Sequence, residues 1–193
     1  MKSETCYLLG ALRDGNFDVR LGKNYELRIY QDNKRWLVSV SELFHRNFRI
    51  KPKITGNLLR INNKKIIEEL LLISEYRNPQ KFWGTPSYLR KCSTEETWWY
   101  VSGFWDSEGG LPLNPETATR KYISFDQKNR DSLEFIRNFL IEEGFRPTNL
   151  TYTGGVWQFR LTRKADVKRF AGKLHSFHQG KYCRLIRLIA SVP

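Results

Sequence analysis

The sequence predicts an α+β fold made of two pseudo-symmetric αββαββα repeats, each with a four-stranded antiparallel sheet. One observation behind this prediction is a duplicated segment, an apolar run that ends on an acid followed by glycine. It reads YLLGALRDG at residues 7–15 and YVSGFWDSEGG at residues 100–110. The other is that residues 48–70 and 145–170 each place a glycine turn before a strand that leads into a helix. Because both patterns occur twice, we expect the two halves to share one topology.

Each duplicated segment is expected to form a helix that packs against the other one. The second run is long and bulky enough for a helix, and glycine is a common helix stop because it enters the left-handed conformation cheaply. Small residues stand where two such helices would meet: Gly10, Ala11, Ser102 and Gly103. In the first copy, Leu9 is an alternative to Gly10 at the packing position. Asp14 and Glu108 would then lie side by side at the helix ends.

An acid in the last turn of a helix is unfavourable by itself. It faces the negative end of the helix dipole, at a cost of about 0.3–1 kcal/mol. A bound cation would offset that cost.

The elements of each half follow from hydrophobic periodicity. In the first half we expect strands at 16–21 and 25–31, a helix at 33–47, strands at 49–54 and 58–61, and a helix at 63–74. In the second half we expect an irregular stretch at 111–119, a strand within 121–129, a helix at 132–143, then two strands around a glycine turn, a helix, and a weakly helical basic end.

The expected domain boundaries follow from breaks in these patterns. The first repeat spans residues 1–75, a linker spans 76–94, and the second repeat spans 95–193. The linker contains glycine and prolines, and we expect its aromatic residues to pack on the domain. Pro112 and Pro115 predict that the first strand of the second half is short or distorted.

Composition and charge limit the classes of function. The 193 residues are 40% hydrophobic and 14% aromatic, which suffices for a folded core. The 33 Lys and Arg exceed the 20 Asp and Glu by 13, and the simplest partner for such a charge is nucleic acid. Apolar runs fall short of the roughly 20 residues that span a bilayer, and no signal pattern opens the sequence. We therefore expect an intracellular, cytoplasmic protein with no membrane partner.

The three cysteines, Cys6, Cys92 and Cys183, are far apart in the sequence and form no C-x-x-C pair. This spacing predicts reduced thiols rather than a structural zinc site.

The duplicated segments resemble the helices that define the LAGLIDADG homing endonucleases, in the single-chain form with two motifs. In the second copy, Gly103 and Gly109 have the family's separation, Asp106 falls on its first acid, and Glu108 falls on its catalytic acid. The first copy is one residue shorter between its glycines but keeps Asp14 directly before glycine. The resemblance, to the kind encoded by archaeal introns, implies a monomer that cuts both strands of a long, asymmetric DNA site.

The resemblance also implies a Mg²⁺ site, with Mn²⁺ as an alternative ion. Asp14 and Glu108 would be the metal ligands and catalytic carboxylates, because carboxylates hold divalent ions that activate water and neutralise the leaving oxygen. Either acid alone is interpreted as an ordinary helix end, whereas the pair favours function. Asp106 has an alternative interpretation as a capping or solvent-facing residue.

Two further pairs have catalytic roles by the same resemblance. Gln31 and Gln127 would order metal-bound water. Lys64 and Lys164 would take a basic position near the scissile phosphate, where an ammonium group can stabilise developing charge. A slip of one residue would instead put Asn63 or Arg163 at this position.

The exposed faces of the two sheets would form a saddle that enters the DNA major groove. The candidate DNA-binding residues are Arg20, Glu26, Arg28, Lys53, Arg120, Gln158, Arg160 and Arg163. Neutralising about 6–10 phosphates would make the affinity fall steeply with salt. The alternative function is a non-cleaving nucleic-acid binder of the same fold, such as an RNA maturase that assists intron splicing. Binding without strand scission would support that alternative.

Overall fold

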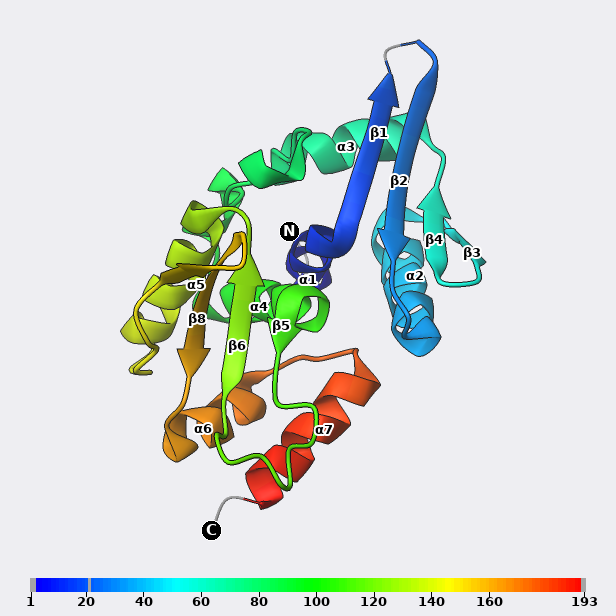
Figure 1. The fold of residues 1–193 in the computed structure, drawn as a ribbon. Coiled ribbons are helices and arrows are strands. Elements are labelled where there is room, and N and C mark those ends of the chain that lie inside the picture. The colour runs from blue at the N-terminus through cyan, green and yellow to red at the C-terminus, as the bar shows by residue number, and fades with distance from the viewer. Residues whose placement is uncertain (1–2, 21, 192–193) are drawn as a thin grey trace.

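The two duplicated segments form paired helices at the centre of the molecule. A computed structural model of the chain describes residues 3–20 and 22–191. The helices α1 (Ser3–Ala11) and α4 (Thr94–Glu108) lie against each other, and one sheet lies on each side of the pair (Figure 1). This arrangement confirms the predicted helix interface.

Glycines let these two helices approach to backbone contact. A Cβ added at Gly10 would lie 2.3 Å from the carbonyl oxygen of Tyr100. One added at Gly103 would lie 2.0 Å from the carbonyl oxygen of Tyr7. The packing position of the first copy is therefore Gly10 and not Leu9.

The first half forms a four-stranded antiparallel sheet in the order β1-β2-β4-β3. Its elements are η1 (Leu12–Asp14, a 3₁₀ helix), β1 (Gly15–Arg20), β2 (Asn24–Tyr30), α2 (Lys34–Phe48), β3 (Lys53–Thr55), β4 (Leu58–Ile61) and α3 (Lys64–Ser74). The sheet buries Phe17, Leu27, Ile29, Leu59 and Ile61 in the core. Its other face carries the polar side chains.

The second half repeats this topology in the order β5-β6-β8-β7. Its elements are β5 (Gly109–Gly110), β6 (Ile123–Gln127), α5 (Arg130–Glu142), β7 (Thr151–Thr153), β8 (Val156–Leu161), α6 (Lys164–Lys173) and α7 (Gln179–Ala190). The predicted α+β fold with two matching sheets is thus confirmed. Strand β5 has only two residues, as Pro112 and Pro115 predicted.

Two strand boundaries differ from the predicted ones for local reasons. The strand expected at 49–54 begins only at Lys53, because α2 continues to Phe48 and Arg49 ends it in the left-handed conformation, with φ of 56°. In the strand expected at 16–21, Leu21 lies outside the described residues. Asn33 caps α2 by accepting a hydrogen bond from the Trp36 backbone, which sets the helix start at Lys34.

The segment that joins the halves packs on the domain. It contains the 3₁₀ helices η2 (Gln80–Phe82) and η3 (Ser87–Lys91). Trp83 is buried and stacks on Tyr76 with 4.6 Å between ring centroids. The expectation that aromatic residues anchor the segment is confirmed for Trp83, although Phe82 remains 66% exposed.

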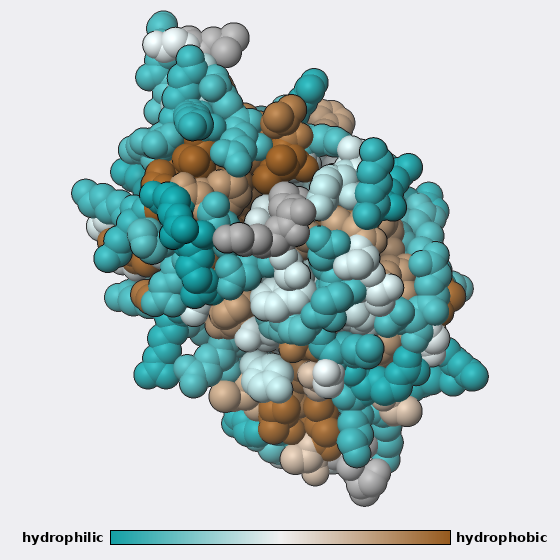
Figure 2. Space-filling view, turned by 180° about the vertical axis from the view of Figure 1, so that it is seen from behind, coloured by the Kyte–Doolittle hydropathy of each residue, from teal (hydrophilic) through white to brown (hydrophobic). Residues whose placement is uncertain are grey.

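The outer surface is largely hydrophilic. In the view from behind, polar side chains cover most of the face and separate a few apolar patches (Figure 2). Within residues 3–20 and 22–191, the helices lack the combination of length and apolar character that a membrane span requires.

Candidate active site

Asp14 and Glu108 come together at the ends of the paired helices. Asp14 closes η1, which continues α1, and Glu108 is the last residue of α4. Both acids line one pocket of about 330 Å³. The other residues that line it are Gly15, Asn16, Gln80, Asp126, Gln127, Lys128 and Val156. The pocket therefore joins both sheets and the linker at the two acids.

The glycines after these acids are required by close packing rather than by a left-handed backbone. Gly15 and Gly109 have φ angles of −97° and −77°, so the expected left-handed helix stop was wrong at both sites. A Cβ at Gly109 would lie 2.1 Å from Cδ1 of Trp105, and one at Gly15 would lie 2.7 Å from the Leu12 carbonyl oxygen. Only glycine lets a strand begin directly after each acid.

Both carboxyl groups hold their protons more tightly than ordinary carboxyls do. Burial raises the pKa of Asp14 to about 6, although the charge of Lys181 and a hydrogen bond from Gln31 lower it. Burial, followed by the negative charge of Asp14, raises the pKa of Glu108 to about 7. Burial therefore outweighs the nearby positive charge, and a divalent cation in the pocket would favour the ionised form of each group.

The donor set of the pocket suits a divalent ion with oxygen ligands. Two carboxylates face the same space, and Asp126 adds a third acid to the lining. Carboxylate and amide oxygens are preferred by Mg²⁺ and Mn²⁺, whereas softer ions prefer sulfur and imidazole. The mutual repulsion of Asp14 and Glu108 is what a shared or adjacent cation would relieve.

Gln31 and Gln127 occupy matching positions beside the two acids. Nε2 of Gln31 donates to Oδ2 of Asp14 at 3.0 Å. Gln127 is buried at the end of β6, and its amide lowers the pKa of Glu108. The structure thus brings both predicted glutamines to the candidate site, although Nε2 of Gln127 has no hydrogen-bond partner among the described residues.

The predicted basic pair, Lys64 and Lys164, lies outside the pocket lining. Lys64 begins α3, and its ammonium group is 5.3 Å from the ring centroid of Tyr25, which pairs with Val19. Val19 is five residues beyond Asp14 along an extended strand, a separation of about 17 Å. Lys164 begins α6 at the corresponding place. Strands β4 and β8 run away from the acids, so the geometry does not support a role for either lysine at the scissile phosphate.

Lys181 in α7 supplies an ammonium group near the acids that the sequence did not suggest. Its Nζ lies 3.1, 2.8 and 3.2 Å from the carbonyl oxygens of Trp105, Asp106 and Ser107. These carbonyls belong to the last turn of α4, where a cation is favourable. The charge of Lys181 lowers the pKa of both Asp14 and Glu108, and burial lowers its own pKa to about 8. A lysine about 70 residues downstream gives no sequence signal of this contact.

Arg13 is a second cation that sequence reasoning missed. Its side chain is fully buried, and it donates to the carbonyl oxygens of Trp83 at 2.5 Å and Gly84 at 2.6 Å. It also donates to the Tyr100 hydroxyl at 3.1 Å. Its positive charge lowers the pKa of Glu108. Arg13 therefore ties the linker to the candidate site while partly balancing its charge.

Asp106 has a structural position and does not line the pocket. It is buried and accepts hydrogen bonds from the Tyr7 hydroxyl at 2.5 Å and the Ser176 hydroxyl at 2.6 Å. The backbone amides of Phe177 and His178 donate to it at 2.8 and 3.0 Å. Asp106 thus anchors the segment that leads into α7, which places Lys181 at the end of α4. The alternative that it faces solvent was wrong.

The polar face of the first sheet presents arginines held by a buried acid. Glu26 is only 5% exposed and forms ion pairs with Arg28 and with Arg60, whose Nε lies 3.0 Å from Oε1 of Glu26. Glu26 lies on the predicted polar face of the sheet, where these two guanidinium groups cover it. Arg60 was not predicted, yet cross-strand pairing places it between Arg28 and Lys53. Arg20 is exposed and bonds its neighbour Asp18 at 2.8 Å.

The polar face of the second sheet is less basic. Gln158 donates to Asp126, so its amide points toward the pocket side of the sheet. Arg160 lies over the Tyr122 ring at 4.4 Å. Arg120 and Arg163 are exposed in the segments before β6 and after β8. All four predicted residues therefore lie on or beside this sheet, and their DNA contacts stay predictions.

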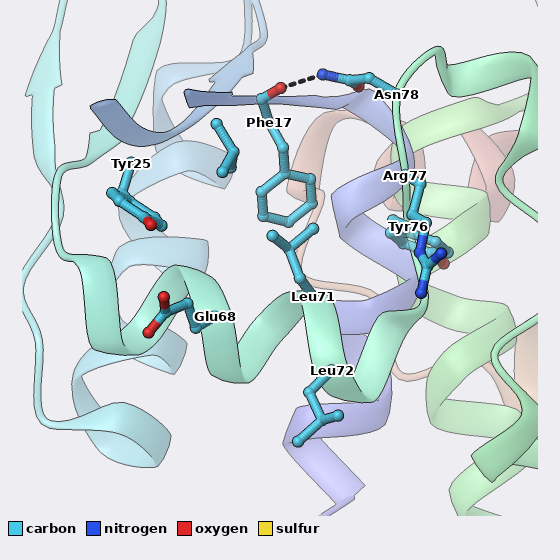
Figure 3. A pocket seen from close by; sticks show the side chains of 9 residues that line it. Phe17, Tyr25, Glu68, Leu71, Leu72, Tyr76, Arg77 and Asn78 are labelled. Carbon is cyan, nitrogen blue, oxygen red and sulfur yellow. Dashed lines mark hydrogen bonds between the residues drawn. The ribbon is translucent and has the colours of Figure 1, made fainter. Parts of the chain in front are cut away.

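A larger pocket, of about 490 Å³, lies between β1 and α3 (Figure 3). It is lined mainly by apolar side chains such as Phe17, Leu71 and Leu72, and Asn78 donates a hydrogen bond to the Phe17 carbonyl at its edge. Glu68 is the acid in its lining, so this pocket has no paired carboxylates.

Known proteins resemble the chain over most of its length. No protein-family model matches it. The homing endonuclease I-ApeI of Aeropyrum pernix is 30% identical over 198 residues, which cover 95% of this chain and 86% of the relative. The structure of I-DmoI in complex with DNA and Mn matches with a TM-score of 0.66 at 19% identity, over 90% of this chain and 97% of that one. The structure of I-WcaI bound to its DNA recognition sequence matches with a TM-score of 0.63 at 14% identity, over 97% and 86%.

Proposed function

We propose that Asp14 and Glu108 carry the catalysis of this chain, which belongs to the LAGLIDADG homing endonuclease family. The family assignment makes the chain a site-specific DNA endonuclease that acts on double-stranded DNA with a divalent metal ion. The observation that carries the residue assignment is that both duplicated helix ends deliver a carboxyl group to one pocket between the two sheets.

Each residue of the pocket has a proposed role that follows from its position. Asp14 and Glu108 would hold the divalent ion, which would lower the pKa of a water molecule and neutralise charge on the leaving oxygen. Gln31 and Gln127 orient the two carboxylates and the water around them. Lys128 is an exposed cation in the lining, where it would be available to a DNA phosphate. In this arrangement one carboxylate would serve each strand of a duplex.

Two cations behind the pocket partly offset the effect of burial on the acids. Lys181 and Arg13 lower the pKa of Glu108, and Lys181 also lowers that of Asp14. Both are engaged with backbone carbonyls, so they balance charge without occupying the space where the divalent ion would bind.

Mg²⁺ is the proposed physiological ion, with Mn²⁺ as a functional substitute. The pocket offers oxygen ligands, which both ions accept. Solved structures of I-DmoI with its DNA contain Mn or Ca, or were obtained in the presence of Mg, in agreement with a site that takes several divalent ions.

The polar faces of both sheets are the proposed DNA-binding surface, and one chain suffices for cleavage. Arg28 and Arg60 stand next to each other on the first sheet, and Arg160 lies on the second. Because a single chain carries both acids, we propose that it acts as a monomer. Its DNA substrate makes an intracellular, cytoplasmic location at the nucleoid the proposed place of action.

A cleavage assay on DNA that spans the uninterrupted insertion junction tests this function. We expect binding in Ca²⁺, double-strand scission at one position in Mg²⁺ or Mn²⁺, and no scission in a chelator. DNA that already carries the inserted element is the matched control and should stay intact. Tight binding without scission in either ion would instead favour the non-cleaving, maturase-like function. Absence of site-specific binding would refute both.

A further inference from the structure

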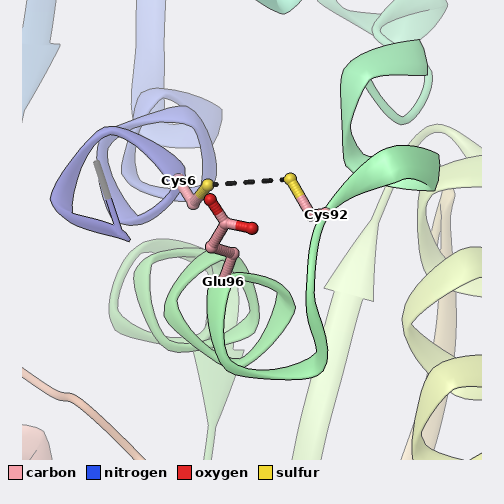
Figure 4. A group of neighbouring side chains, drawn as sticks. All are labelled: Cys6, Cys92 and Glu96. Atoms are coloured by element: carbon pink, nitrogen blue, oxygen red, sulfur yellow. Dashed lines mark hydrogen bonds between the residues drawn. The ribbon is translucent and has the colours of Figure 1, made fainter. Parts of the chain in front are cut away.

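Two cysteines that are 86 residues apart in the sequence meet at the other end of the helix pair. Cys6 is buried on α1, and Cys92 follows η3 and is half-buried. Their sulfur atoms are 4.0 Å apart. A carboxylate oxygen of Glu96, in the first turn of α4, completes a group whose ligand atoms all lie within 4.8 Å of one another (Figure 4).

The sulfur separation suits two thiolates on one metal ion better than it suits a disulfide. Tetrahedral zinc with bonds of about 2.3 Å separates two thiolate sulfurs by about 3.8 Å. A disulfide requires about 2.05 Å, so the sulfurs would have to close by about 2 Å. The first geometry needs almost no movement of Cys6 or Cys92.

The surroundings also favour a bound cation. The carboxylate of Glu96 lies beside both thiols, so a cation bound among the three groups would balance its negative charge. The group lies at the N-terminus of α4, a helix of 15 residues whose dipole favours anionic ligands at this end.

Glu96 is held in place before any ion binds. Its Oε2 accepts from the backbone nitrogen of Ser93 at 2.9 Å and from the Ser93 hydroxyl at 3.0 Å. The first of these bonds forms the capping box of α4 together with the Glu96 backbone nitrogen, which donates to the Ser93 hydroxyl at 3.3 Å. Both side-chain bonds use Oε2, which leaves Oε1 to an ion. A preformed carboxylate and two converging thiols resemble a three-ligand site with one position open to water.

We propose that Cys6, Cys92 and Glu96 form a second metal site, which takes one thiophilic divalent ion such as Zn²⁺. On binding, each thiol forms a sulfur–metal bond and releases its proton to solvent, and no electron is transferred. The site lies eight residues from Asp14 on one helix and twelve from Glu108 on the other, about 12 and 18 Å along the axes. It clamps α1 to the start of α4 and is separate from the catalytic pocket.

Cobalt and zinc titrations test the site without relying on cleavage. The protein carries C183S, which removes the exposed third cysteine, and is prepared with a thiol-free reductant after treatment with a chelator. We expect one equivalent of Co²⁺ to produce a thiolate-to-cobalt charge-transfer band that Zn²⁺ abolishes, and we expect Zn²⁺ to raise Tm. C6S and C92S should each lose the band and the Tm shift, and E96Q, which keeps the cap, should weaken binding at least tenfold.

Two controls separate this site from the catalytic one. The D14N/E108Q double variant should keep the cobalt band, whereas its Mg²⁺-dependent cleavage is lost if the proposed catalytic roles are right. C92S, at the half-buried position, should still cleave DNA in Mg²⁺, which shows that it folds. Absence of the band and of a Tm shift in C183S would overturn the proposal. A disulfide that forms under dioxygen in C183S, with no metal binding after its reduction, would also overturn it.

Discussion

Replacing Gly103 with alanine tests whether backbone contact between α1 and α4 positions the two acids. The added Cβ would lie 2.0 Å from the Tyr7 carbonyl oxygen and 2.8 Å from the Tyr7 carbonyl carbon. Ordinary Cβ contacts begin at 3.4 Å, so the helices must separate locally by 1.4 Å (3.4 − 2.0). Neither atom belongs to a flexible side chain that could move aside.

The expected cost follows from that displacement. Overpacking a rigid contact costs about 3 kcal/mol at the upper end of its usual range. Alanine in place of glycine stabilises a helix by about 1 kcal/mol. We therefore expect Gly103→Ala to lower the free energy of unfolding by about 2 kcal/mol. Because a shift of about 1 Å at a catalytic site can reduce the rate 100-fold, cleavage should fall by about that factor.

Urea denaturation and single-turnover cleavage measure the two effects. Gly172→Ala in α6 is the matched control, since a Cβ there meets no atom within 4 Å. That variant should be as stable as the parent or more stable by up to about 1 kcal/mol. If Gly103→Ala matched Gly172→Ala in stability and in cleavage rate, the close helix contact would have no role in placing the acids.

Three other perturbations probe the charges of the site. With limiting Mg²⁺, the cleavage rate should fall as pH drops through about 7 and then about 6, because Glu108 and Asp14 must lose their protons to bind the metal. Saturating Mg²⁺ should move this fall to lower pH, and a pH profile that does not depend on the Mg²⁺ concentration would contradict the assignment. Lys181→Met should lower the free energy of unfolding, measured by urea denaturation, by about 2–3 kcal/mol, because it removes charged hydrogen bonds to buried carbonyls. The control Lys168→Met, on the exposed side of α6, should leave that free energy nearly unchanged. Arg60→Ala should reduce the slope of log affinity against log salt by about 0.9 if its guanidinium group contacts phosphate, and an unaltered slope would place it outside the DNA interface.

The fold was predictable because its signal is local and duplicated. Small residues such as Gly10 and Gly103 mark backbone contact, and alternation in the strands marks one buried face. The positions of Asp14 and Glu108 follow from that pairing alone. Gln31 and Gln127 were reached through a family pattern, and the strand ends on which they lie point them at the acids.

The remaining features depend on contacts between distant segments. Lys64 and Lys164 matched a family position by alignment, but strand direction carries them away from the pocket. Lys181 reaches the end of α4 only because Asp106 anchors the chain before α7. The sequence does not distinguish Arg13 from an ordinary surface arginine. Its burial depends on the linker carbonyl oxygens to which it donates hydrogen bonds.

Strand-resolved cleavage by Asp14→Asn and Glu108→Gln, each made singly, tests the central claim most directly. Asp131→Asn, which changes an acid at the exposed start of α5, is the control and should cleave like the parent. Both active-site variants are expected to bind target DNA in Ca²⁺ and to make no double-strand breaks in Mg²⁺. Double-strand scission at the parent rate by either variant would contradict the proposal that the paired helix ends form one metal-dependent catalytic centre.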